Sequence, residues 1–167
     1  MMNYEVLDNA LPTEVFEQIQ HYIMFQCDWY FSDNIVKEED KQFPISYFVH
    51  SFYELYSTYD VKISHGFNAI KPILEALNPK SIRRIKGNQY VNQNLFVEHG
   101  LHTDSDDEHM KAAIFYVNGN NGYTMFESGE KIESVENRLL IFNSNIPHKS
   151  TNCTDELRRI TVNFNYY

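Results

Sequence analysis

The sequence of 167 residues is poor in cysteine and has no long hydrophobic run. Its only cysteines, Cys27 and Cys153, match neither a disulfide framework nor a metal-ligand spacing, which favours the reducing cytoplasm. No stretch approaches the roughly 18 apolar residues that a membrane-spanning helix needs. The first residues, MMNYEVLDNA, lack the basic start and the apolar run of a signal peptide. We therefore expect a cytoplasmic protein without a membrane partner.

Positive charge is also scarce, and this bears on the binding partners. The chain has 14 Lys and Arg against 23 Asp and Glu, which gives a formal net charge of -9. Broad binding to a phosphate backbone needs a basic surface, so a nucleic-acid partner is disfavoured, although a single nucleotide in a pocket is compatible with the charge. We expect a small-molecule or peptide substrate instead.

Aromatic residues, in contrast, are abundant. With 12 Tyr, 12 Phe and 43% hydrophobic residues, the composition is that of a globular protein and leans towards β-structure. A chain of this length can bury about two thirds of its unfolded surface, so it needs no disulfide to fold. We expect one domain over residues 1–167, helical and rich in loops over 1–80 and mainly β over 81–167.

The N-terminal half carries the helical patterns. Apolar residues recur at helical spacing over 12–26, where Pro12 suits the first turn, and again over 64–78, where Pro72 either kinks the helix or begins its better half. A short strand is expected at 4–8. The segment 27–50 reads as a long loop with at most one short strand, which is typical either of a lid or of a disordered insert.

From residue 81 onward, short β-rich runs follow one another, separated by Gly and Asn turns. The expected strands are Ser81–Val91, Leu95–Glu98, Lys111–Val117, Tyr123–Phe126, Lys131–Ser134, Arg138–Phe142 and Arg159–Phe164. Regularly spaced short strands indicate a sandwich, a jelly roll or a barrel. Helices that precede an antiparallel sheet usually cover one of its faces. We therefore predict a mainly β fold in which two helices from the N-terminal half pack on one sheet.

Three side chains form a candidate metal site. His102 and Asp104 are two residues apart, which on a strand places both on one face, and His148 follows the run NRLLIF. The His-x-Asp pair alone is weak evidence, because a chain with seven His would contain one by chance about four times in ten. Two imidazoles and one carboxylate on an octahedral ion leave three positions open, the facial arrangement of non-haem iron(II) oxygenases.

A second candidate element lies near the C-terminus. In the run RITVNF, alternation places Arg159, Thr161 and Asn163 on one face and apolar residues on the other. A polar face that begins with Arg is expected only where it lines a pocket. The planar guanidinium matches a carboxylate bidentately, and Thr161 can add a hydroxyl donor. Arg158 falls on the apolar side, so Arg159 is the preferred anion-binding residue.

The order of the motifs in the second half of the chain resembles the prolyl hydroxylase branch of the iron(II)/2-oxoglutarate-dependent dioxygenases. The motifs are, in order, the His102-x-Asp104 pair, the strands AAIFYVN, GYTMF and NRLLIF, His148 and Arg159-x-Thr161. The resemblance covers about residues 82–166. It implies a double-stranded β-helix (a jelly roll) whose mouth holds iron.

The resemblance also implies roles for single residues. His102, Asp104 and His148 match the catalytic iron ligands. Arg159 matches the residue that pairs with the distal carboxylate of 2-oxoglutarate, with Thr161 and Tyr116 assisting. Tyr90 matches a pocket-lining tyrosine on the strand before the His-x-Asp pair.

The chemistry implied is the coupling of 2-oxoglutarate decarboxylation to hydroxylation of a substrate. Iron(II) is the metal, 2-oxoglutarate and dioxygen are co-substrates, and the resemblance leaves room for ascorbate. A prolyl or another amino-acid side chain is the expected substrate. Two other functions stay open: a metal-dependent, cupin-like isomerase or binding module without oxygenase activity, and oxidation of a nucleobase, which the acidic composition disfavours.

Overall fold

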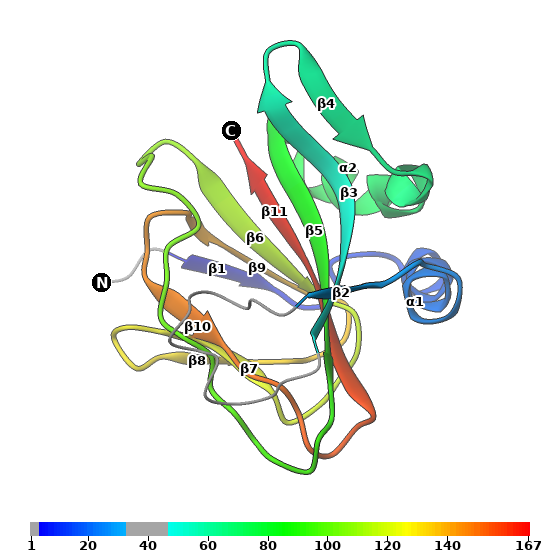
Figure 1. Ribbon diagram of the computed structural model, residues 1–167, viewed down its shortest axis with the longest axis vertical. Helices are drawn as coiled ribbons and strands as arrows, with labels where there is room; N and C mark the ends of the chain where they lie inside the picture. Colours follow the sequence, from blue (N-terminus) through cyan, green and yellow to red (C-terminus); the bar gives the residue numbers. More distant parts are fainter. Residues whose placement is uncertain (1–3, 33–46) are drawn as a thin grey trace.

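A computed structural model describes residues 4–32 and 47–167 (Figure 1). Its helices are α1 (Thr13–Phe25), a 3-10 helix (His65–Ile70) and α2 (Lys71–Leu77). Its strands are β1 (Tyr4–Leu7), β2 (Tyr30–Ser32), β3 (Tyr47–Ser57), β4 (Asp60–Ile63), β5 (Ile82–Val91), β6 (Lys111–Tyr116), β7 (Tyr123–Phe126), β8 (Lys131–Glu133), β9 (Arg138–Asn143), β10 (His148–Ser150) and β11 (Arg158–Tyr166). Within these residues, no helix is long and apolar enough to cross a membrane.

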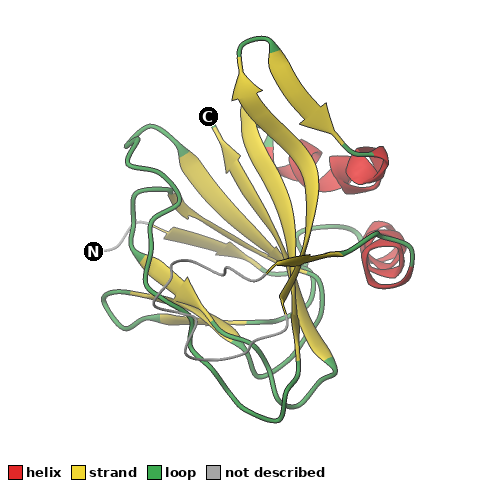
Figure 2. Cartoon of the chain, viewed as in Figure 1, coloured by secondary structure: helices red, strands yellow, loops and turns green. Residues whose placement is uncertain are grey.

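The strands form two antiparallel sheets. The large sheet has the order β1-β9-β6-β11-β5-β3-β2, with β4 paired to β3, and the small sheet has the order β10-β7-β8. Figure 2 shows the two sheets on the same side of the molecule, with both helices beyond the large sheet. The expected jelly roll, with two helices packed on one sheet, is confirmed.

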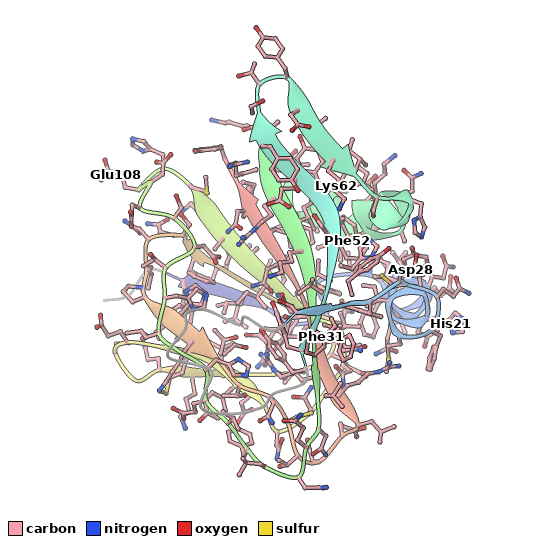
Figure 3. All side chains as sticks on the ribbon, in the orientation of Figure 1. His21, Asp28, Phe31, Phe52, Lys62 and Glu108 are labelled. Carbon is pink, nitrogen blue, oxygen red and sulfur yellow. The ribbon has the colours of Figure 1, made fainter. Side chains whose placement is uncertain are left out.

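The two faces of the large sheet bury different cores. On the helix side, Phe16, Ile19 and Ile23 of α1 pack in one cluster with Phe52 of β3 and Val162 of β11. In Figure 3, His21 of α1 lies at the outer edge of the molecule, and Lys62 of β4 is exposed as well. A second cluster, between the two sheets, holds Ile114, Tyr116, Phe126, Ile132, Leu140 and Phe142. Both faces of the large sheet are therefore covered.

β11 is the central strand that positions the candidate site. It pairs with β5 along one edge and with β6 along the other. Its apolar residues Ile160, Val162 and Phe164 belong to the helix-side core, as the alternation predicts. The alternate residues of β11, Arg159 and Thr161 among them, face a cavity between the sheets.

The structure also differs from the sequence-based expectations. The helix expected over 64–78 begins as a 3-10 helix and becomes α-helical at Lys71, because Pro72 sits in the first turn of α2, where its missing N–H costs nothing. The run Leu95–Glu98 is no strand: Glu98 makes only one isolated bridge, to Thr151.

The expectation for residues 1–80, which is helices and loops with a short strand at 4–8 and at most one more within 27–50, misses the hairpin of β3 and β4, which extends the large sheet. The alternation in β3 is broken by a bulge between Ser51 and Tyr53, so its burial pattern does not show in the sequence. Of the expected loop 27–50, residues 30–32 and 47–50 are strands; the proposed lid falls largely on residues 33–46, outside the described residues.

Candidate metal centre and adjoining cavity

The segment that holds His102 and Asp104 pairs with the start of β10 at His148, and this brings the candidate metal ligands together. His102 and His148 form an isolated antiparallel bridge: each backbone N–H donates to the other's carbonyl, at 2.9 and 2.8 Å. Their rings therefore lie side by side, with centroids 4.5 Å apart. The ligand atoms of His102, Asp104 and His148 all lie within 4.8 Å of one another, so one ion between them is within reach of all three.

Both imidazoles are held in the tautomer that a metal requires. Nδ1 of His102 lies 3.2 Å from the carbonyl oxygen of Gly100, and Nδ1 of His148 lies 3.0 Å from that of Ile146. Because a carbonyl only accepts, Nδ1 carries the hydrogen in each ring and Nε2 keeps its lone pair for a metal. Burial lowers the pKa of His148, which favours the neutral, ligating form.

The carboxylate of Asp104 is oriented by the large sheet. Its side chain is only 6% exposed, and its Oδ2 accepts a hydrogen bond of 2.9 Å from Nδ2 of Asn165 on β11. Oδ1 lies 3.7 Å from the guanidinium of Arg84 on β5 and 3.9 Å from Nε2 of His102. A fixed carboxylate beside two neutral imidazoles, without thiolates, suits a divalent ion that keeps open positions better than structural zinc.

Arg159 is the most unusual side chain of the site, because it is a fully buried cation without a carboxylate partner among the described residues. Its Nε donates to Ser134 at 2.7 Å, and its Nη1 donates to Ser150 at 2.7 Å and to the Thr151 carbonyl at 3.2 Å. Nη2 has no partner. Burial lowers the pKa of Arg159, and a guanidinium in such a place calls for an anion.

A glycine makes room for this guanidinium stem. A Cβ at Gly122 would lie 2.5 Å from Cδ of Arg159 and 2.6 Å from the carbonyl oxygen of Asn152, both far inside normal contact distance. The Gly that begins the GYTMF segment, directly before β7, is therefore required by the close approach of Arg159.

A cavity of ≈ 320 Å³ joins the metal ligands to Arg159. It lies between the sheets and is lined by Tyr47, Arg84, Lys86, Asn88, Tyr90, His99, His102, Thr103, Asp104, Ile114, Thr124, His148, Ser150, Arg159, Thr161 and Asn163. The volume is at the lower end of the range for small-molecule sites. It places the three metal ligands and the unpaired guanidinium on one cavity, so a bound molecule can contact both.

The other residues singled out in the sequence also gather here, though not all face the cavity. Tyr90 and Thr161 line it. Tyr116 does not: it is fully buried, its ring centroid lies 5.7 Å from the Arg159 guanidinium, and its hydroxyl donates to Thr124 at 2.8 Å. Thr124, which does line the cavity, stands between Tyr116 and a ligand.

Arg158 points the other way, as the strand register predicts. Its Nη2 donates 2.7 Å to the backbone carbonyl of Met24 at the end of α1, and its guanidinium lies 5.9 Å from the Phe25 ring centroid. It therefore ties α1 to the helix side of β11.

The sequence patterns did not single out His99, which also belongs to the site. His99 is 5% exposed and lines the cavity, and its ring lies tilted against Tyr90 with the centroids 4.6 Å apart. Neither ring nitrogen of His99 has a hydrogen-bond partner in the described part of the chain, and burial followed by the charge of Arg159 lowers the pKa of His99 to about 3. The backbone bond from His99 to the Ser150 carbonyl, 2.8 Å long, sets this placement, and no local pattern reveals it.

Lys86, Asn88 and Tyr47 were missed as well. Lys86 and Asn88 share a face of β5 with Tyr90, so the alternation that revealed Arg159 could have revealed them too. Tyr47 stacks on Tyr90 at 4.9 Å and donates a 2.5 Å hydrogen bond to Oδ1 of Asn88. Its position depends on β3, a strand that the sequence did not predict.

No protein-family model and no curated protein matches the sequence. Solved structures do. A 2OG-Fe(II) oxygenase family oxidoreductase from Burkholderia pseudomallei superposes with a TM-score of 0.68 at 10% identity, covering 98% of this chain and 84% of that one. A prolyl hydroxylase from Trichoplax adhaerens, in complex with a hypoxia inducible factor peptide fragment, gives 0.65 at 15% identity, covering 98% and 83%.

A third similar structure is SnoN, a non-heme alpha ketoglutarate dependent epimerase from nogalamycin biosynthesis. It gives a TM-score of 0.63 at 8% identity and covers 98% of this chain and 77% of that one. The chain thus has the fold of the 2-oxoglutarate and iron(II) oxygenases, the fold that the motifs predict.

Proposed function

We propose that this chain is a non-haem iron(II), 2-oxoglutarate-dependent oxygenase that hydroxylates a prolyl or another amino-acid side chain. The observation that carries the proposal is the shared cavity: His102, Asp104 and His148 converge at one place on its wall, and the unpaired guanidinium of Arg159 lies at another. A dicarboxylate that is chelated to a metal at one end needs such a cation at the other.

The residues present fit both groups. His102, Asp104 and His148 would hold iron(II), with both Nε2 atoms free for it. Arg159 would pair with the distal carboxylate of 2-oxoglutarate through Nη2, the one guanidinium nitrogen without a partner. When bound, iron and 2-oxoglutarate together supply the activation of dioxygen and the oxidising power of the reaction.

The protein's own part is to bind, to orient and to keep water out. Hydrogen bonds to Ser134 and Ser150 fix the plane of the Arg159 guanidinium, so this side chain is already ordered before the co-substrate binds. Thr161 offers a hydroxyl on the same strand face, and Tyr90 with His99 forms an aromatic wall of the cavity. Burial raises the pKa of Tyr90, so its hydroxyl stays protonated and available as a donor.

The choice of a prolyl or amino-acid side chain rests on the resemblance to the prolyl hydroxylase branch and on the peptide-bound structural neighbour. The competing function is a cupin-like isomerase or binding module, and the epimerase neighbour shows that this fold accommodates another reaction outcome. The buried guanidinium of Arg159, which has no carboxylate partner among the described residues, favours the 2-oxoglutarate-dependent oxygenase. A metal-binding module that takes no dicarboxylate would not need a cation at this position.

The test is thermal unfolding with Mn²⁺ in place of iron(II), with and without 2-oxoglutarate. At 100 times its dissociation constant, a ligand adds about 2.7 kcal/mol to the free energy of unfolding, a rise in melting temperature of about 5 to 10 °C for a chain of this size. Glutarate, which lacks the keto oxygen, is the matched control and should give a clearly smaller rise. Equal shifts, or none, would refute the proposal; succinate release with iron(II) and a substrate panel then tests turnover.

A further inference from the structure

The cavity holds one cation that the proposed function leaves unused. Lys86 of β5 lines the cavity, with its Nζ 5.3 Å from the centroid of the Tyr47 ring. It makes no ion pair with any residue in the described part of the chain; Glu54 and Asp104 act on it only from greater distance. Partial burial is the main reason that the pKa of Lys86 is lowered to about 8.

The other charged side chains of the cavity already have a partner or a proposed ligand. Asp104, the single acidic residue among the described residues that line the cavity, serves the metal, and Arg84 lies beside that carboxylate while its Nε donates to Asn165. The paired strands place Glu54 opposite Arg84, and both border a neighbouring cavity. Arg159 serves the co-substrate, and a divalent metal balances a doubly charged dicarboxylate. Among the described residues, Lys86 therefore keeps an uncompensated charge when metal and co-substrate are bound.

A structural role accounts poorly for this placement. The contact with the Tyr47 ring offsets only part of the cost of taking an ammonium group partly out of water when no anion accompanies it. Lysine also has a long, flexible stem that reaches solvent easily elsewhere. Its retention in the cavity of a chain with a net charge of -9 points to a ligand.

We infer that the substrate carries a carboxylate which Lys86 binds, and that it is a free amino acid or a similarly small carboxylic acid. A residue within a peptide chain has an amide in that place. The size of the cavity agrees: ≈ 320 Å³ must hold the co-substrate and the reacting part of the substrate. This inference rests on the proposed function and narrows its substrate class.

The test measures binding of matched pairs to the protein loaded with Mn²⁺ and 2-oxoglutarate. Each L-amino acid, proline included, is compared with its amide by calorimetry, alongside end-blocked peptides that contain Asp or Glu. At least one acid should bind about tenfold or more tightly than its amide, the contribution of a charge-assisted hydrogen bond. Lys86→Met should abolish that preference and leave 2-oxoglutarate binding unchanged, and Lys86→Arg should restore most of it.

Lys71→Met is the charge-matched control. Lys71 is exposed at the start of α2, beyond the opposite face of the large sheet, so its loss should leave the preference intact. The inference is wrong if no acid binds better than its amide, or if Lys86→Met keeps the preference. An end-blocked acidic peptide that binds better than every free acid overturns the assignment of a small substrate. If 2-oxoglutarate itself does not bind, the proposed function is refuted, and the inference about the substrate is refuted as well because it rests on that function.

Discussion

Replacement of Arg159 by methionine separates the function of this residue from its place in the fold. Methionine keeps an unbranched stem of similar length but removes the charge from a side chain that is 0% exposed. The change removes hydrogen bonds to Ser134, Ser150 and the Thr151 carbonyl, and it also removes the cost of burying a guanidinium whose Nη2 is unpaired.

The two effects on stability oppose each other. Each hydrogen bond to a charged group contributes about 1.5 to 3 kcal/mol, and the desolvation of the ion costs several kcal/mol in return. We expect the free energy of unfolding of the ligand-free Arg159→Met protein to stay within about 2 kcal/mol of the wild-type value. The affinity for 2-oxoglutarate, in contrast, should fall about 10²-fold, because a charge-assisted pair of about 3 kcal/mol is lost.

The assay pairs urea unfolding of the ligand-free protein with calorimetric titration of 2-oxoglutarate in the presence of Mn²⁺. Arg158→Met is the matched control: it loses the bond to the Met24 carbonyl and should cost about 1 kcal/mol of stability without changing the affinity. If Arg158→Met lost the affinity instead, the assignment of the two arginines to their faces would be wrong. If neither variant changed it, Arg159 would not bind the co-substrate.

Three further predictions follow from single contacts. Gly122→Ala should lower stability by about 1 to 3 kcal/mol and weaken 2-oxoglutarate binding, because its Cβ would displace the Arg159 stem; unfolding and titration measure both. Asn165→Leu should weaken Mn²⁺ binding about 10- to 100-fold by freeing Asp104, as measured by calorimetry. The pKa of His99 is about 3 in the folded state and about 6.5 in the unfolded state. Because the unfolded state therefore binds more protons below pH 6.5, the free energy of unfolding should fall by up to about 1.4 kcal/mol per pH unit as the pH falls below 6.5. His99→Phe should flatten this dependence of the free energy of unfolding on pH, as measured by urea unfolding.

Each of these has an outcome that contradicts it. An unchanged affinity in Gly122→Ala would mean that Arg159 has room to move aside. Full Mn²⁺ affinity in Asn165→Leu would show that Asp104 needs no such support. The control for His99→Phe is His109→Asn, since His109 is exposed and should not affect the slope. An equally steep slope in His99→Phe would assign the acid sensitivity to other groups, among them the buried His148.

Several features of this protein can be predicted from local patterns of apolar and polar residues in the sequence. The helix over 12–26 and most strands after residue 81 follow from apolar spacing, because backbone geometry alone sets which side chains share a face. The same rule separates Arg159 from Arg158, and the structure places them on opposite faces of β11. The His102-x-Asp104 spacing likewise needs only an extended backbone to bring two ligands to one side.

Only the tertiary structure decided the rest. His148 meets His102 through a bridge between segments far apart in sequence, and His99 is buried because its backbone pairs with Ser150. The β3 strand is hidden by a bulge, so the cavity wall that Tyr47 forms was not predicted. Periodicity shows which residues share a face, whereas what covers that face depends on pairing between distant segments. For this reason the sequence identified Arg159, and only the structure showed that its Nη2 has no partner.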